Sequence, residues 1–518
     1  MLVCLTAPPA AQPARSALSG AAQLALAYDA IFDARFDEVP RLLETACLPR
    51  GADGSRTAPA VGGPARAAAE ACQLLDVVAL WWQMQLDPDS LTLDARFAAR
   101  ADAAISAIDA WTVAEPQRAE AWFYRGAAYG VRAQWRVLRG ERIAAARDGP
   151  RIKSALERAL ALDPSLQDAY VGIGLYQYYA DVAPAAAKMV RWLLALPGGD
   201  RTEGLRQMVR ARREGELLRD EADYQLHLIY LWYEKQPEQA LALLRGLASA
   251  HPRNPHFAGA AADLEDVHLS DHAGSLSSWR ALLEDARARR VTEPVLTEMR
   301  ARIGVARQLD ALSETDAALD HLRAVIDARP VAPFGAFALA QLRLGQGLDR
   351  LGRRTEALAA YREALAVAPT RDTLTIAAQA RTGMRTTPTA EDTLAYQLSL
   401  EGWRALERGD LAGAARALSR SLALRPLDQV TRYRRARLLE AQKHDRAAID
   451  LYESVMSAAP AQTPPAIFAA ASLQAAGLYE REGDKARAIE LYERARTAFG
   501  AGTHTREAAA RALARADR

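Results

Sequence analysis

The chain has 518 residues, half of them apolar and a quarter charged, which is the composition of an ordinary folded protein. Its formal net charge is only +2, so the chain as a whole has no strong electrostatic attraction to nucleic acid or to an acidic membrane. The sequence contains no run of about 18 uncharged apolar residues, and therefore no helix is expected to span a bilayer.

The first 20 residues are expected to be a disordered end or the remnant of a signal peptide. They contain a short apolar run followed by small residues, MLVCLTAPPAAQPARS. The basic beginning and the longer apolar stretch of a standard secretion signal are missing. An exported, periplasmic location is favoured slightly over a cytoplasmic one.

Two cysteines near this end are candidates for a disulfide. Cys47 ends one predicted helical stretch, Cys72 begins the next, and a loop rich in Gly and Pro joins them. Such a loop would let the two sulfurs meet, and disulfides persist in exported proteins. The alternative is a pair of small buried thiols. No CxxC motif occurs, so a redox or zinc motif of that type is absent.

Residues 170–204 combine a helix rich in Gly and Tyr with an apolar insert at 182–197. The insert is too short to cross a bilayer, so it either folds back onto neighbouring helices or lies at a membrane surface. Packing is favoured because the flanking repeats need their open edges covered. Asp200 and Glu203 then have the spacing of a capping box at the start of another helix.

From about residue 299 onward, small and large residues recur with a period of about 34, which is typical of an array of helical hairpins. Small residues at copy positions 8 and 20 would let two helices approach closely, and large ones at 4, 11 and 24 would fill the seam. Glycine at position 15 fits the left-handed backbone that ends the first helix. Proline at position 32 marks the end of the second helix. The copies begin near residues 299, 338, 395, 429 and 469.

The two clearest copies are 338–371 and 395–428. Asp410 and Asp484 follow glycines at position 15 and are expected to cap the next helix. Upstream the pattern is weaker: residues 221–254 lack the glycines, and extra residues interrupt the match that begins at Trp122. The residues at positions 8, 15, 20, 24 and 32 are Gly345, Gly352, Ala357, Tyr361 and Pro369 in one copy, and Gly402, Gly409, Ala414, Leu418 and Pro426 in the other.

These features resemble the tetratricopeptide repeat family, most clearly between residues 299 and 500. The resemblance implies an all-α fold, a right-handed superhelical solenoid of antiparallel helix pairs. The segment 170–204 is distantly similar to the tetratricopeptide repeat protein 39 group. Neither resemblance brings catalytic residues with it.

The expected organisation has three folded parts after the N-terminal end. Residues 21–369 would form a degenerate N-terminal array with the inserted helix near 182–197. Residues 370–394 are rich in Thr and lack the glycine markers, so they would form a connector or a degenerate repeat. Residues 395–518 would form a C-terminal array that ends in a closing helix.

The resemblance also implies where a ligand would bind, because the first helix of each pair lines the concave side at copy positions 2, 5, 9, 12 and 13. Large aromatic and arginine residues at such positions are typical of interface hot spots, although residues at the same spacing often pack between repeats. The lysine/asparagine clamp of chaperone-binding repeat proteins is not visible, since its positions hold Val171 and Leu175, or Ser399 and Trp403. The predicted groove residues are Tyr178, Tyr179, Trp232, Tyr233, Arg307, Trp403, Tyr433 and Arg437.

No motif for catalysis, a cofactor or a metal emerges. His268 and His272 are spaced i and i+4, but Ser270, Asp271 and Gly274 indicate the end of a helix, and HExxH is absent. We therefore expect a non-catalytic scaffold that binds a protein or peptide in its groove, with no cofactor and no nucleic-acid partner. One alternative is a peripheral cell-envelope assembly factor that contacts lipid or a membrane protein through residues 182–197. Another is an accessory subunit of an enzyme encoded elsewhere.

Overall fold

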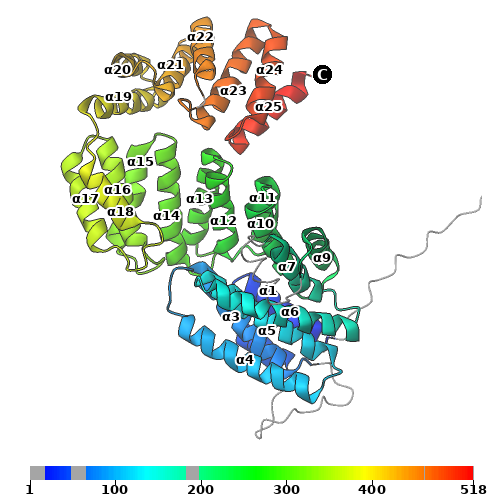
Figure 1. Ribbon diagram of the computed structural model, residues 1–518. Helices are drawn as coiled ribbons and strands as arrows, with labels where there is room; N and C mark the ends of the chain where they lie inside the picture. The colour runs from blue at the N-terminus through cyan, green and yellow to red at the C-terminus, as the bar shows by residue number, and fades with distance from the viewer. Residues whose placement is uncertain (1–17, 48–65, 183–197, 460, 517–518) are drawn as a thin grey trace, which may run out of the picture. The chain divides into compact units, whose positions relative to one another are not determined.

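The computed structural model describes residues 18–47, 66–182, 198–459 and 461–516. Within these ranges the regular secondary structure is α-helical, apart from one isolated β-bridge between Cys47 and Ala67. The prediction of an all-α fold is confirmed. By their contacts the helices form two compact units, Met1–Asn254 and Pro255–Arg518 (Figure 1).

The first unit holds the helices up to α11. Their bounds are α1 Ala21–Phe32, α2 Val39–Ala46, α3 Ala69–Leu86, α4 Asp94–Ala114, α5 Ala119–Leu138, α6 Arg142–Leu162, α7 Ala169–Val182, α9 Arg201–Glu214, α10 Arg219–Trp232 and α11 Pro237–Ala250. Successive helices pack as pairs, of which α5 with α6, α7 with α9 and α10 with α11 make the most extensive contacts.

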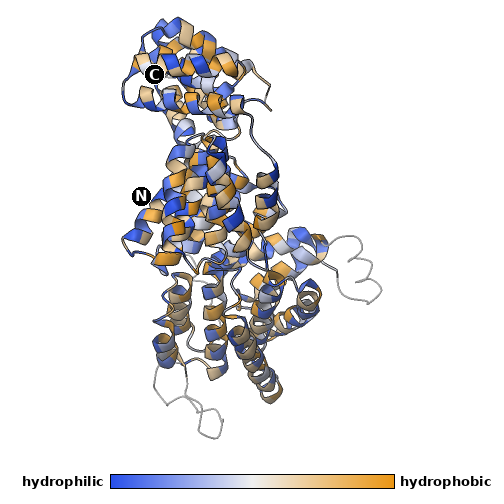
Figure 2. Cartoon of the chain, turned by 90° about the vertical axis from the view of Figure 1, so that its left-hand side faces the viewer, coloured by the Kyte–Doolittle hydropathy of each residue, from blue (hydrophilic) through white to orange (hydrophobic). Residues whose placement is uncertain are grey.

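The second unit continues the same pairing. Its helices are α12 Pro255–Val267, α13 His272–Arg287, α14 Pro294–Ala311, α15 Thr315–Ala328, α16 Ala336–Arg350, α17 Arg354–Ala366, α18 Ile376–Arg385, α19 Ala390–Glu407, α20 Leu411–Leu424, α21 Gln429–Ala441, α22 Asp445–Ser457, α23 Pro465–Glu482, α24 Lys485–Thr497 and α25 Thr503–Ala516. Figure 2 shows that the helices carry both apolar and hydrophilic residues, as expected where one face is buried against a neighbour.

The predicted small-to-large packing inside a pair is present. A Cβ atom on Gly402 would lie 2.5 Å from Cγ of Leu418, and one on Gly345 would lie 2.6 Å from Cε1 of Tyr361. Both distances are well below ordinary van der Waals contact. A larger residue at either glycine would therefore force the facing side chain to shift.

Position 15 has a left-handed backbone in every copy from residue 299 onward, whether or not it holds a glycine. The same is true of Lys235, at position 15 of the segment 221–254. Because L side chains are strained there, the turn between paired helices imposes this conformation on the residue that occupies it. The φ angles are 56° for Lys235, 62° for Ser313, 69° for Gly352, 78° for Gly409, 64° for Lys443 and 87° for Gly483.

The predicted helix caps are confirmed. The Asp410 carboxylate accepts a hydrogen bond from the backbone N–H of Gly413 at 2.8 Å, and Asp484 accepts one from Arg487 at 3.0 Å. Asp200 accepts the N–H of Glu203 at 2.9 Å and starts α9. Each carboxylate satisfies one of the backbone donors that a helix start leaves free.

The extra residues upstream lengthen a helix pair. Helix α5 has 20 residues and α6 has 21, against 15 and 13 in α16 and α17. The pair keeps the close approach of the shorter repeats, since a Cβ on Gly126 would lie 2.5 Å from Leu156. The pattern matches at both ends of this pair because the added turns lie between them.

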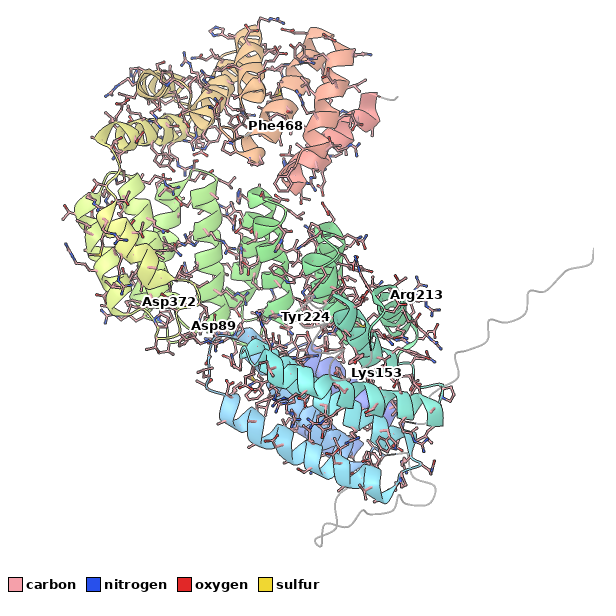
Figure 3. All side chains as sticks on the ribbon, viewed as in Figure 1. Asp89, Lys153, Arg213, Tyr224, Asp372 and Phe468 are labelled. Carbon is pink, nitrogen blue, oxygen red and sulfur yellow. A yellow bond between two sulfur atoms is a disulfide. The ribbon has the colours of Figure 1, made fainter. Side chains whose placement is uncertain are left out.

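The interior of the first unit is filled by its own aromatic side chains. The rings of Trp82 on α3 and Tyr224 on α10 are 4.9 Å apart, and those of Phe32 and His251 are 5.5 Å apart; Tyr224 is labelled in Figure 3. The backbone carbonyl of Phe32 accepts a hydrogen bond from Nδ2 of Asn254 at 2.7 Å. The first helices of this unit thus pack directly on its last pair.

Residues 370–394 contain α18, which packs on α16 and α17. Asp372, labelled in Figure 3, caps it by accepting the N–H groups of Ile376 at 2.7 Å and Ala377 at 2.8 Å. No second helix pairs with α18, because residues 386–389 lead without helical structure into α19. The segment therefore supplies half of a helix pair.

The predicted insert at 182–197 is described only at Val182, the last residue of α7; the rest lies outside the described residues. Among the helices that the structure describes, none combines the length and apolar character needed to cross a membrane.

Candidate binding surfaces

Three of the predicted groove residues in the first unit, all tyrosines, meet one another, and Trp232 directly precedes one of them in the chain; we call Tyr178, Tyr179, Trp232 and Tyr233 the aromatic patch. The three tyrosines meet edge to face: ring centroids are 5.7 Å apart for Tyr178 and Tyr179, 5.8 Å for Tyr178 and Tyr233, and 5.4 Å for Tyr179 and Tyr233. Edge-to-face pairs of this kind are favourable beyond the apolar area they bury. Helix α7 and the end of α10 therefore hold the three tyrosines in one arrangement.

The members of the aromatic patch differ in exposure, and this separates their roles. Tyr178 is fully buried and Tyr179 is half-buried, whereas Trp232 is 53% exposed and Tyr233 is 45% exposed. The outer two rings can contact a ligand directly. Tyr178 packs beneath Tyr233, so for Tyr178 the alternative holds that such residues pack between repeats.

An ion pair fixes the buried side of the aromatic patch. Tyr178 donates its hydroxyl hydrogen to Oε1 of Glu234 at 2.5 Å, and Nε of Arg201 donates to the same oxygen at 2.8 Å. The hydrogen bond from Arg201 lowers the pKa of Glu234, and burial together with Glu234 raises the pKa of Tyr178. At neutral pH, Glu234 is thus a charged acceptor and Tyr178 a protonated donor.

Sequence reasoning missed Glu234 and Arg201. Glu234 directly follows the aromatic run that it supports, so its position in the sequence was a usable signal. Arg201 lies at the start of α9, and nothing in the 34-residue pattern relates it to the end of α10.

In the second unit, Arg307 is held by ion pairs. Its guanidinium is 2.6 Å from Asp263 and 2.8 Å from Asp266. His272 also contacts Asp266, with Nδ1 and Oδ1 3.0 Å apart. A ligand carboxylate would have to compete with both aspartates for Arg307.

The remaining predicted residues are spread over α19 and α21. The guanidinium of Arg434 lies over the ring of Trp403, 5.6 Å from its centroid. Tyr433 is half-buried, with its ring 5.9 Å from that of Tyr452. Arg437 makes one long ion pair with Glu440, at 3.8 Å. These side chains do not form a cluster like the aromatic patch.

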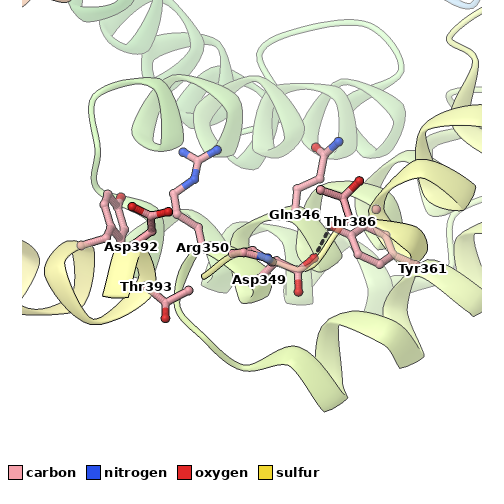
Figure 4. A pocket seen from close by; sticks show the side chains of 10 residues that line it. Gln346, Asp349, Arg350, Tyr361, Thr386, Asp392 and Thr393 are labelled. Carbon is pink, nitrogen blue, oxygen red and sulfur yellow. Dashed lines mark hydrogen bonds between the residues drawn. The ribbon is translucent and has the colours of Figure 1, made fainter. Parts of the chain in front are cut away.

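A cavity of about 320 Å³ lies where α16 and α17 meet α18 and α19 (Figure 4). None of the predicted groove residues lines it. Its charged side chains are already in ion pairs, so its walls present no unpaired charge to activate a substrate. These pairs are Arg350 with Asp310, Asp349 with Arg354, and Asp392 with Arg425.

Cys47 and Cys72 lie at disulfide distance, with their Cα atoms 6.3 Å apart. Next to them, the N–H of Ala67 donates to the carbonyl of Ala46 at 2.8 Å. This contact brings the two ends of the intervening loop together, as the sequence analysis required for a disulfide.

Within the described residues, no group of three or more His, Cys, Asp or Glu side chains is placed to hold a metal ion. His268 and His272 lie on either side of the turn between α12 and α13, and Asp271 caps α13 by accepting the N–H of Gly274 at 2.7 Å. The aspartate at this turn thus has a structural role.

Paired helices, left-handed turns at position 15 and an absence of strands among the described residues define an all-α helical-repeat protein. Residues 338–371 match the family model described as "Tetratricopeptide repeat". Residues 338–371 are therefore a tetratricopeptide repeat, and the match coincides with one of the two clearest copies in the sequence. No curated protein matches the chain.

Several solved structures are similar to the chain at low sequence identity. A tetratricopeptide repeat protein from Parabacteroides merdae ATCC 43184 is 15% identical, with a TM-score of 0.25, over 58% of this chain and 99% of that one. A Rap protein complexed with competence and sporulation factor is 13% identical, with a TM-score of 0.30, over 96% and 99%. The human IFIT1 dimer with m7Gppp-AAAA is 12% identical, with a TM-score of 0.26, over 89% and 77%. At these TM-scores, the ligands of those proteins say nothing about the ligand of this one.

Proposed function

We propose that this protein is a non-catalytic scaffold that binds a segment of another protein on the aromatic patch of its first unit. The observation that carries the proposal is the exposure of Tyr233, which packs edge to face on a buried Tyr178 that Glu234 fixes; its chain neighbour Trp232 is exposed as well. Repeat folds of this kind are typical of protein-interaction scaffolds.

Large aromatic side chains suit this role because they bury much apolar area while losing little conformational entropy. The edge-to-face contacts of Tyr179 and Tyr233 restrict the rings before a ligand arrives. Such preorganisation lowers the entropic cost of binding. A partner that packs an apolar side chain against the exposed ring of Tyr233 would gain contact area and leave the scaffold unchanged.

The test is affinity capture from the native organism, with the wild-type chain and the double variant Trp232→Ala/Tyr233→Ala as baits. The variant should lose the specific partner and keep its helical circular-dichroism signal, because both side chains are exposed. Phe499→Ala, which removes another exposed ring at 63% exposure, is the matched control and should retain the partner. Capture of the same partner by wild type and double variant would refute the proposal.

Two alternative functions are a peripheral envelope factor and an accessory subunit of an enzyme. A peripheral envelope factor would use residues 182–197, of which the structure describes only Val182. Flotation with liposomes tests it: no binding, with or without that segment, removes the lipid version. An accessory subunit would use the same protein-binding surface, so the identity of the captured partner separates it from a general scaffold.

For localisation, we propose export to an oxidising compartment, supported by the disulfide distance between Cys47 and Cys72. Mass spectrometry of the mature N-terminus, combined with thiol labelling of unreduced protein, tests this. Alkylation of both Cys47 and Cys72 in protein isolated from its native compartment would contradict this proposal.

A further inference from the structure

The turn between α14 and α15 is hydrogen-bonded to side chains of α19 and α21, which lie later in the same unit. We call residues 313–316 the acidic turn, because their sequence is Ser-Glu-Thr-Asp. We call the three side chains that contact it, together with the serine that one of them hydrogen-bonds, the receptor face. They come from α19 and α21 and are Tyr396, Ser399, Arg404 and Arg434.

Arg404 recognises both carboxylates of the acidic turn. Its Nε and Nη2 lie 3.0 Å and 2.9 Å from the two oxygens of Asp316, and Nη2 is also 3.1 Å from Glu314. Two parallel bonds from a planar guanidinium to one carboxylate are both strong and geometrically selective. The hydrogen bond to Asp316 raises the pKa of Arg404.

Arg434 recognises the backbone of the acidic turn. Its Nη2 donates to the carbonyl oxygen of Ser313 at 2.8 Å, and its Nη1 donates to Oγ of Ser399 at 2.9 Å. Arg434 is only 3% exposed, and no carboxylate of the described residues lies within ion-pair distance of it. Burial of a charged arginine is costly unless its N–H groups are hydrogen-bonded. The hydrogen bonds of Arg434 to Ser313 and Ser399 supply such partners, so they depend on geometry more than a general charge attraction does.

Thr315 completes the contact, with its Oγ1 2.7 Å from the hydroxyl oxygen of Tyr396. Every residue of the acidic turn therefore has a partner on the receptor face. Tyr396 and Ser399 hold copy positions 2 and 5, which the repeat resemblance assigns to ligand binding. Tyr396 thus both holds a groove position and contacts the acidic turn, whereas Ser399 is linked to the turn through Arg434.

We propose that the acidic turn is an internal ligand of the receptor face. When this turn is displaced, the receptor face binds an acidic turn of a partner protein in which one residue separates two carboxylate side chains. The ligand groups are side-chain carboxylates and an internal carbonyl, so the site differs from a clamp for a chain terminus. This surface lies in the second unit, and the inference does not depend on the aromatic patch.

The covalent link within one chain keeps the receptor face occupied. A tethered segment competes at an effective concentration in the millimolar range, which a free partner must overcome. Helices α18 and α19 are joined by the non-helical residues 386–389, so displacement of α19 requires no helix to unwind. Unless α25 stays in place, this displacement must also break the hydrogen bond from the N–H of Thr503 to Asp271, at 3.0 Å. Any change that weakens the internal contact should therefore raise affinity for an acidic segment in trans.

The experiment measures binding of a fluorescent peptide of residues 309–320 to the full-length chain by anisotropy. The variant Glu314→Gln/Asp316→Asn should bind the peptide at least about tenfold more tightly than wild type, because its own turn competes less well. Adding Arg404→Gln to this variant should abolish the gain. Equal binding by wild type and the double variant, or a gain that survives Arg404→Gln, would overturn the proposal.

A matched control removes two carboxylates that lie outside the acidic turn. Asp320 and Glu356 pair with Arg323 and Arg353, so Asp320→Asn/Glu356→Gln makes the same change in charge without touching the receptor face. This control should bind the peptide like wild type; a matching gain would reduce the effect to net charge and refute the inference. If the acidic-turn double variant loses its helical signal, Glu314→Gln alone carries the test, and no gain with that folded variant would also overturn the proposal.

Discussion

Lys443 and Gly409 have the same left-handed backbone at equivalent positions of successive repeats, with φ angles of 64° and 78°. Glycine adopts this conformation without strain, whereas a side chain on an L residue crowds the following carbonyl. The helical hairpin thus determines the backbone conformation of the turn. The residue at that position determines only how much strain energy the conformation costs.

Replacing Lys443 with glycine should stabilise the protein. Relief of the left-handed strain is worth roughly 1–2 kcal/mol, and the greater freedom of glycine in the unfolded chain offsets about 0.4–1 kcal/mol of it. We expect Lys443→Gly to raise the free energy of unfolding by up to about 1.6 kcal/mol. Urea denaturation followed by circular dichroism measures the change.

The control for this variant is Arg420→Gly, at an exposed position within α20. There the same type of substitution should destabilise by about 1 kcal/mol, because glycine is a poor helix former. If both substitutions shift the stability in the same direction, the left-handed strain at Lys443 is not the controlling effect.

Reduction of the Cys47–Cys72 pair should destabilise the first unit. The two residues are 25 positions apart, and closing a loop of that length in the unfolded chain is worth about 3 kcal/mol. Cys47→Ser/Cys72→Ser should show the same loss without reductant, and Cys4→Ser, which keeps both partners, should match wild type. Unfolding curves that do not change on reduction would mean that the two sulfurs are not bonded.

Acid should weaken the first unit through His227. Burial lowers the pKa of this side chain to about 4, from an ordinary value of 6.5. Below pH 6.5 the unfolded chain takes up a proton that the folded chain refuses, so stability is retained above that pH and is lost as pH falls toward 4. Between pH 7 and pH 5 the loss from His227 should be about 2 kcal/mol.

The pH dependence is isolated by comparing wild type with His227→Gln, because carboxyl groups such as Glu221, whose pKa burial raises, contribute equally to both chains. The difference in unfolding free energy between the two should change by about 2 kcal/mol over this range. His444→Gln, which removes an exposed histidine outside the first unit, is the matched control for the loss of an imidazole. Parallel profiles for wild type and His227→Gln would contradict the account.

Local features of the fold could be predicted because short-range geometry determines them. The close contact of Gly402 with Leu418 and the capping by Asp410 and Asp484 all arise within one repeat, where spacing alone brings the groups together. The left-handed Lys235 was missed because the prediction relied on glycine, while the hairpin imposes the conformation on any residue at that position.

Contacts between distant repeats could not be predicted. Arg404 and Asp316 are 88 residues apart, and Arg434 and Ser313 are 121 apart. A period of about 34 residues describes how each hairpin packs on the next, but contains no information on which later helix returns to an earlier turn. Side chains with a partner of this kind can be found only once the chain is folded.

The aromatic patch, too, could be predicted from the sequence only in part. Its positions follow from the repeat offsets, which select Trp232 and Tyr233 as well as the buried Tyr178. Their exposure depends on how α9 and α10 meet, and on Arg201 and Glu234, which pair across these elements. The sequence therefore indicates the place of the aromatic patch but not which of its rings reach the surface.

The most direct test of the account is the affinity of the captured partner for wild type and for Trp232→Ala/Tyr233→Ala, measured by isothermal titration calorimetry on chains of equal helicity. Loss of two exposed anchor side chains should weaken binding at least about 30-fold, the effect of a hot spot of 2 kcal/mol. An unchanged dissociation constant would contradict the claim that the aromatic patch is the binding surface.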